Sequence, residues 1–213
     1  MTAATSLLAF AGLVVTLAIV WRQSWPGRLR LFAFQSLLLA VLAATLGVLA
    51  GRPRLVLLGL VFLVIKVVVI PRVLYRIGSG MPVRPVAPGK SSGITLLVAG
   101  VLIVVAYAVM LPLRTVTALP TAGAIPLAFA MALIGLFLCV TGRDALGHIL
   151  GFLVFENGIF GLALLATYGL PGIVEAGVFL DVLIIVLIME GVVGQVRREH
   201  ESIDEPKLRE LRG

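Results

Sequence analysis

Long apolar segments dominate this chain and limit what it can fold into. Seven of them approach or exceed the roughly 20 residues that a helix needs to cross the hydrocarbon core of a bilayer. They are residues 5–20, 31–50, 55–70, 93–111, 123–141, 145–168 and 172–196. The composition agrees, because 61% of the residues are hydrophobic and only 13% are charged. The sequence therefore predicts an all-α, polytopic integral membrane protein with about seven transmembrane helices.

Proline, glycine and charged residues separate the apolar segments and suggest how the chain is organised. The expected parts are an N-terminal three-helix segment at 1–78, a Pro/Gly-rich cytoplasmic loop at 79–92, a fourth helix with its connection at 93–118, a three-helix unit at 119–198 and a cytoplasmic tail at 199–213. The first apolar segment lacks the basic start of a signal peptide, so we expect it to be retained as a helix.

Lysine and arginine residues predict the orientation of the helices. With the N-terminus outside, the inner segments hold 13 of these residues, the outer segments hold 3, and Lys66 lies within an apolar segment. Basic residues accumulate on the cytoplasmic side of membrane proteins, so the predicted orientation is N-terminus out and C-terminus in. The same placement accounts for the net charge of +7 without a nucleic acid partner, because most basic residues lie at the ends of apolar segments.

Two acidic residues lie near the centres of apolar segments. Glu156 is in the sixth segment and Asp181 is in the seventh. An ionised carboxylate at mid-bilayer costs about 2.5 to 3.5 kcal/mol on insertion scales, so such a side chain must face protein or water. One interpretation is a carboxyl group that carries protons or ions across the membrane. The other is a structural hydrogen bond between helices.

Glu175 and His148 are weaker candidates for the same pathway. Glu175 precedes Asp181 by six residues, which places the two about 120° and about 9 Å apart on a helix. They could serve one hydrated path but not one shared site, and Glu175 could also be an ordinary interfacial carboxylate. His148 lies about 12 Å before Glu156 along the helix. It could pass protons to Glu156 from the cytoplasm, or be an interfacial histidine without a role.

Lys66 is the one basic residue deep inside an apolar segment, and valines and isoleucine surround it in the sequence. We expect it to pair with a carboxylate from another helix or another subunit, or to lose its proton. Pro71 follows five residues later and lacks a backbone N–H, so it is predicted to break the helix and to free the carbonyl of Val67. A purely structural pairing of Lys66 is the alternative. Gln35, in the second segment, is expected to bond a neighbouring helix.

Sequence motifs for redox chemistry or nucleotide hydrolysis are missing. The sequence has no Walker motif, no GxGxxG and no HExxH. A single cysteine, Cys139, cannot ligate an iron–sulfur cluster, and two histidines offer no plausible pair of haem ligands. We therefore expect no cofactor, no metal and no catalytic centre in this chain.

Several short motifs together resemble the hydrogenase-4 component E family, which are membrane subunits of energy-converting [NiFe]-hydrogenase complexes of the formate-hydrogenlyase type. The motifs are GFLVFENG at 151–158, IVEAG at 173–177 with Leu180-Asp181, FQSL at 34–37, and Ile65-Lys66 with Ile70-Pro71. The resemblance covers most of the chain. It implies that the last three helices are similar to the K subunit of bacterial complex I and to the C subunit of Mrp-type antiporters.

The resemblance implies a function as well. The chain would be a non-redox membrane-arm subunit of a complex-I-like complex in the cytoplasmic membrane of a prokaryote. Its neighbours would be antiporter-like subunits and quinone-site-like or hydrogenase membrane subunits, and partner subunits would carry iron–sulfur clusters and a [NiFe] centre. Glu156, Asp181, Glu175, Lys66 and His148 would line a pathway for protons or sodium ions. The alternatives are a purely structural subunit of the same complex and a free-standing small ion transporter.

Overall fold

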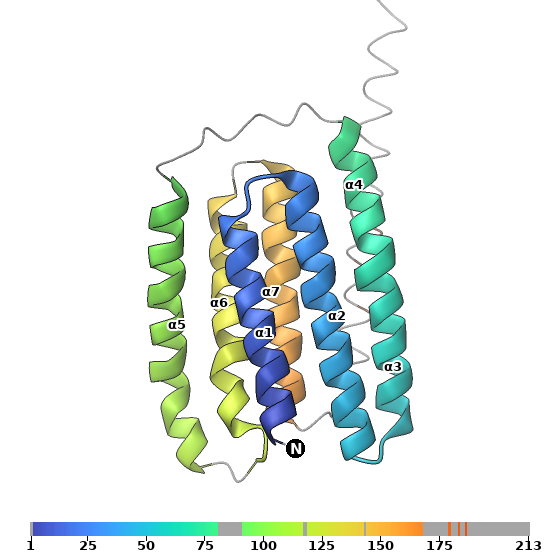
Figure 1. Cartoon of the computed structure of the whole chain (residues 1–213), viewed down its shortest axis with the longest axis vertical. Helices are drawn as coiled ribbons and strands as arrows, with labels where there is room; N and C mark the ends of the chain where they lie inside the picture. The colour runs from blue at the N-terminus through green and yellow to red at the C-terminus, as the bar shows by residue number, and fades with distance from the viewer. Residues whose placement is uncertain are drawn as a thin grey trace, which may run out of the picture. The chain divides into compact units, whose positions relative to one another are not determined.

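The computed structural model of the chain describes residues 2–80, 91–116, 119–142 and 144–167, together with Phe179, Leu183 and Val186. The chain divides into two units, Met1–Val178 and Phe179–Gly213, and all of the helices labelled in Figure 1 lie in the first. Within the described ranges the regular structure is entirely helical. The predicted all-α class is confirmed.

The described residues form seven α-helices, one π-helix and one 3₁₀ turn. Their bounds are α1 Thr2–Trp21, α2 Trp25–Leu49, α3 Pro53–Leu63, the π-helix η1 Val64–Val69, α4 Ile70–Gly80, α5 Ser91–Val116, the 3₁₀ turn η2 Ala122–Ala124, α6 Ile125–Thr141 and α7 Ala145–Ala166. Because α3, η1 and α4 form one continuous rod, six helices are long and apolar enough to cross a membrane. They correspond to the first six predicted segments. The seventh, 172–196, lies outside the described residues except for Phe179, Leu183 and Val186.

The six helices that can cross a membrane run alternately in opposite directions, with α3, η1 and α4 counted as one, as Figure 1 shows. Proline helps to start several of them. Pro26, Pro53 and Pro126 each occupy the first or second position of a helix, where the missing N–H costs nothing and the fixed φ angle suits a helix. The turn between α2 and α3 contains Gly51 at φ 64°, a conformation that only glycine adopts freely. Chain reversals are thus encoded by local residues.

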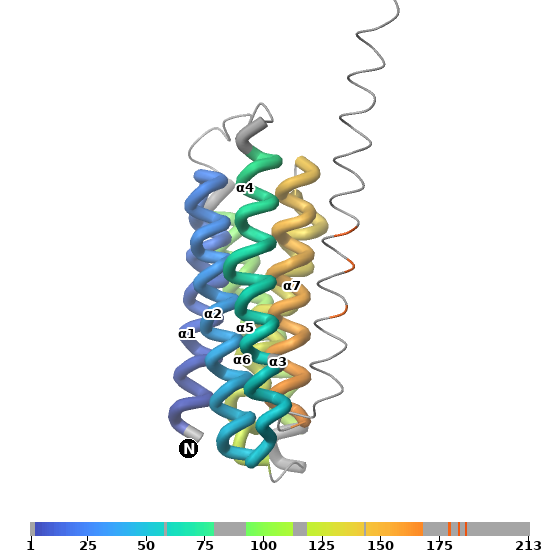
Figure 2. The backbone as a smooth tube through the Cα atoms, turned by 90° about the vertical axis from the view of Figure 1, so that its right-hand side faces the viewer, coloured from blue at the N-terminus to red at the C-terminus, as the bar shows by residue number. Residues whose placement is uncertain are grey.

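The third helix ends later than predicted. Pro71 was expected to break it, but the rod continues through Pro71 to Gly80 (Figure 2). The physical reason is the π-helix η1, in which the N–H of Ile70 donates to the carbonyl of Ile65, five residues back. A wider turn absorbs the proline, which has no N–H to donate four residues back. Pro71 therefore reshapes the helix around Lys66 instead of ending it.

The centre of the bundle is the contact between α6 and α7. A Cβ added at Gly135, Gly151 or Gly158 would lie 2.2 Å from a backbone nitrogen of the facing helix. Glycines at these positions let the two backbones approach closely, which is a common basis of helix association in membranes. In the most apolar stretch of each helix, 61% is buried inside the protein for α6 and likewise for α7. The corresponding share for α5 is only 11%. Accordingly, α5 lies at the edge of the bundle (Figure 1).

Candidate functional site

An ion pair between Lys66 and Glu156 lies inside the bundle. The distance between Lys66 Nζ and Glu156 Oε2 is 3.0 Å, and the exposed fractions of the two side chains are 0% and 6%. Lys66 belongs to η1 and Glu156 to the middle of α7. The expectation that Lys66 pairs with a carboxylate from another helix is confirmed within this chain.

The π-helix contributes to the position of Lys66. Lys66 is the third residue of η1, whose hydrogen bonds reach back five residues instead of four. Such a turn holds one extra residue, so it rotates the residues after it relative to an uninterrupted α-helix. Within η1, Lys66 is buried while Val64 is exposed. π-Helical turns are rare and occur frequently at functional sites.

Asn157, the residue after Glu156, binds the same lysine. Lys66 Nζ donates to Asn157 Oδ1 at 2.9 Å. The amide nitrogen of Asn157 in turn donates to Gln35 Oε1 at 3.2 Å and to Ser36 Oγ at 3.0 Å, both on α2. Asn157 is 1% exposed, so these are hydrogen bonds without competition from water. Asn157 therefore connects the ion pair to α2.

The hydrogen bonds continue from α2 to α1. Gln35 Nε2 donates to Thr16 Oγ1 at 2.7 Å and lies 3.9 Å from Met131 Sδ of α6. The hydroxyl of Thr16 donates to the carbonyl of Gly12 at 2.8 Å. Both Gln35 and Thr16 are buried. The prediction that Gln35 bonds a neighbouring helix is confirmed, and the polar network reaches from η1 and α7 through α2 to α1.

Two phenylalanines form the apolar side of the site. Lys66 Nζ lies 4.8 Å from the centre of the Phe62 ring. The Phe62 ring is stacked on Phe160 of α7, with 4.4 Å between centres and 12° between planes. A cation above an aromatic face is attracted by the ring quadrupole, and the attraction is greater when water is excluded. Lys66 thus has three favourable neighbours: a carboxylate, an amide oxygen and a ring.

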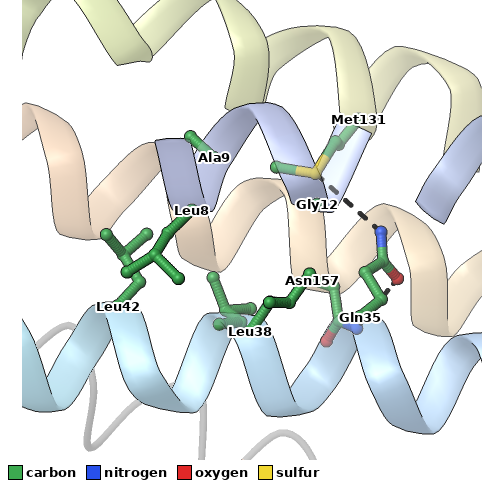
Figure 3. A pocket seen from close by; sticks show the side chains of 9 residues that line it. Leu8, Ala9, Gly12, Gln35, Leu38, Leu42, Met131 and Asn157 are labelled. Carbon is green, nitrogen blue, oxygen red and sulfur yellow. Dashed lines mark hydrogen bonds between the residues drawn. The ribbon is translucent and has the colours of Figure 1, made fainter. Parts of the chain in front are cut away.

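A small cavity adjoins the network at Gln35 and Asn157. The volume that the centre of a water molecule can occupy in this cavity is about 10 Å³. This is close to the minimum for holding one water molecule. Gln35 and Asn157 lie at one end of the cavity, while the rest is apolar (Figure 3). The lining residues are Leu8, Ala9, Gly12, Gln35, Leu38, Leu39, Leu42, Met131 and Asn157.

The remaining predicted residues lie elsewhere. His148 is at the start of α7, where it is exposed and its Nδ1 lies 2.5 Å from the carbonyl oxygen of Cys139 on α6. Along the helix it lies about 12 Å from Glu156. Asp181 and Glu175 fall outside the described residues. In the described part of the chain, no group of three or more His, Cys, Asp or Glu side chains could hold a metal ion.

Asn157, Ser36 and Thr16 belong to the site but were not predicted from the sequence. A signal was available for two of them, because Asn157 follows Glu156 directly and Ser36 follows Gln35 in a mostly apolar segment. Adjacent polar residues in a membrane helix face protein or water for the same reason that a single one does. Thr16 offered no such signal, since an isolated threonine can satisfy its hydroxyl on its own helix.

The Lys66–Glu156 pair is buried, and a buried ion pair contributes little net stability, because removing both charges from water costs about as much as their attraction returns. Removing one partner alone is costly, since it leaves the other charge buried and uncompensated.

Comparisons with known proteins identify relatives of similar length. The chain is 35% identical over 207 residues to a protein named "Uncharacterized protein Rv0085" from Mycobacterium tuberculosis, covering 96% of this chain and 94% of the relative. It is 25% identical over 218 residues to hydrogenase-4 component E of Escherichia coli K12, covering 100% of both, and the Shigella flexneri protein of the same name matches equally. No family profile matches the chain. No solved structure matches it.

Proposed function

Since the chain belongs to the family of the Mycobacterium tuberculosis protein Rv0085 and is a homologue of hydrogenase-4 component E, we propose that it is a non-redox membrane-arm subunit of a hydrogenase-type complex. Six helices that can cross a membrane support this assignment. In this proposal the complex resembles complex I in its membrane arm, and it lies in the cytoplasmic membrane of a prokaryote. Partner subunits would hold the iron–sulfur clusters and the [NiFe] centre.

The observation that carries the function is the buried ion pair of Lys66 and Glu156, 3.0 Å apart. Ionisable residues inside membrane proteins are expensive and commonly mark proton or ion pathways. We propose that Glu156 accepts a proton from one direction along the pathway and passes it on in the other direction. Protonation removes the negative charge beside Lys66, and release of the proton restores the ion pair. The O–H bond of Glu156 forms as the proton leaves its donor, a water molecule or a neighbouring titratable group, and it breaks as the proton passes to the next acceptor of the same kind.

The pathway would extend beyond the described residues. By resemblance, Asp181 and Glu175 would continue it on the seventh helix, and the last three helices would correspond to the K subunit of complex I and the C subunit of Mrp antiporters. Antiporter-like and quinone-site-like or hydrogenase membrane subunits would be the neighbours. Protons are the first expectation for the transported ion, and sodium ions are the second.

The test is a Glu156→Gln variant in the intact complex, in inverted membrane vesicles. Redox turnover and the resulting pH gradient are measured in the same sample. We expect redox turnover to continue while the pH gradient falls at least tenfold, because an amide cannot carry a proton. The matched control is Asp144→Asn, which changes an exposed carboxyl at the start of α7 and should leave the gradient unchanged. A normal gradient with Glu156→Gln would refute the proposed role and favour the structural alternative.

Membership of a complex is tested separately by mass spectrometry of the proteins that co-purify with the chain in mild detergent. We expect antiporter-like membrane subunits together with iron–sulfur proteins. Recovery of the chain alone, stable and monodisperse, would contradict the proposal and favour a free-standing transporter. Replacing sodium with potassium in the vesicle assay distinguishes the two ions, since only sodium transport would depend on it.

A further inference from the structure

The hydrogen bonds that end at Lys66 all have the same direction. A backbone carbonyl can only accept, so the Thr16 hydroxyl donates to Gly12 and its oxygen is left to accept from the Gln35 nitrogen. The Gln35 oxygen therefore faces Asn157 and accepts from the Asn157 nitrogen. The Asn157 oxygen is then left for Lys66, whose Nζ lies 2.9 Å away and donates to it. Each donor in the series follows from the one before it.

We infer that Asn157, Gln35 and Thr16 are positioning residues that keep Lys66 charged, so that Glu156, and not Lys66, is the member of the pair that carries the proton. The division of roles rests on the proposed function. Each amide in the series turns its oxygen toward Lys66, and hydrogen bonds arranged in a chain polarise one another. The combined dipoles favour a positive charge at Lys66.

The surroundings of the pair are consistent with a fixed cation. When Glu156 is protonated, Lys66 retains the Asn157 oxygen at 2.9 Å and the Phe62 ring at 4.8 Å. The described part of the chain contains two acidic residues, Glu156 facing Lys66 and Asp144 at the start of α7. Its other basic residues are arginines toward the helix ends and His148 at the start of α7. From α2, the uncharged Gln35 and Ser36 accept hydrogen bonds from Asn157, which bonds Lys66.

Thr16 allows the inference to be tested at a distance from the ion pair. Thr16→Val keeps the shape of the side chain but removes the acceptor that orients Gln35. Without it, the nearest partner of the Gln35 nitrogen is Met131 Sδ at 3.9 Å, and a thioether is a weak acceptor. The amide of Gln35 can then turn over and place its nitrogen against Asn157, which disrupts the series. Thr16→Ser keeps the hydroxyl and is the matched control.

The experiment uses nitrogen-15 NMR of lysine-labelled full chain in lipid bilayers, where ammonium and amine nitrogens have separate signals. The sequence contains three lysines, Lys66, Lys90 and Lys207, and Lys66→Arg assigns the Lys66 signal. At a pH where wild-type Lys66 gives only the ammonium signal, we expect Thr16→Val to give an amine signal as well, because hydrogen bonds that favour the charged form are lost. Gln35→Met should give a larger amine signal, and Thr16→Ser should match the wild type.

Two results would overturn the inference. One is a Lys66 amine signal in the wild type at neutral pH, and the other is the wild-type spectrum, with the ammonium signal alone, in both Thr16→Val and Gln35→Met. Circular dichroism of each variant verifies that the helices are intact. The measurement requires neither redox partners nor an ion gradient. A failure of the proposed function would therefore appear only in the vesicle assay with Glu156→Gln, and a failure of this inference only in the lysine spectra.

Discussion

Lys66 and Glu156 should show strong energetic coupling in a double-mutant cycle. The singles are Lys66→Met and Glu156→Leu, which remove one charge each and retain much of the side-chain volume. Both side chains are buried, at 0% and 6% exposure, and their charged atoms are 3.0 Å apart, so solvent screens the interaction little. Removing one partner of a buried pair costs about 3–5 kcal/mol, because the other charge is left uncompensated.

We place Glu156→Leu at the lower end of that range, about 3 kcal/mol. Lys66 would still have the Asn157 oxygen and the Phe62 ring beside it. Lys66→Met removes all three of these contacts at once and leaves the buried Glu156 carboxylate without the Lys66 cation. It should therefore cost about 4 kcal/mol or more. The double variant replaces both charges with apolar groups, so it should cost at least about 2 kcal/mol less than the sum of the singles.

The assay is unfolding in mixed detergent micelles at increasing fractions of sodium dodecyl sulfate, followed by circular dichroism. Arg72→Met is the control, because Arg72 is an exposed cation on α4, in the same rod as Lys66. It should change the free energy of unfolding by no more than about 0.5 kcal/mol. If the costs of the two singles add to that of the double within about 0.5 kcal/mol, the pair is not coupled and the reasoning is wrong.

Three further predictions concern the bundle that holds the site. Gly158→Ala should lower the free energy of unfolding by about 1–3 kcal/mol or more, because the added Cβ would lie 2.2 Å from the α6 backbone. Gly100→Ala is the control in the same detergent titration. It should be neutral or stabilising, because the space around Gly100 is open. Thr121→Val should cost about 1–3 kcal/mol by leaving the buried Leu165 carbonyl without its 2.6 Å hydrogen bond, and Thr121→Ser should restore stability. Asp144→Ala removes the cap of α7 and should cost about 1 kcal/mol, whereas Asp144→Ser should cost much less; equal losses in the two variants would contradict the capping role.

The sequence by itself determined the class of protein and the location of most helices. The apolar segments approach or exceed the length that a helix needs to cross a bilayer, and prolines, glycines and charges lie between the segments. These are local properties, since a chain in lipid must satisfy its backbone hydrogen bonds within each helix. Glu156 and Lys66 could also be identified as candidate site residues from the sequence. A charge within an apolar segment requires a partner, whichever neighbour the helix packs against.

Tertiary structure decided which residues meet. Nothing in the sequence pairs Lys66 with Glu156, or connects Thr16 to either of them through Gln35 and Asn157. The physical reason is that lipid and protein interior are both apolar, so the pattern of a membrane helix does not reveal which face contacts another helix. Local reasoning also misjudged Pro71. Its missing N–H is a property of one residue, but the π-helix that accommodates it and the burial of Lys66 depend on the helices packed around it.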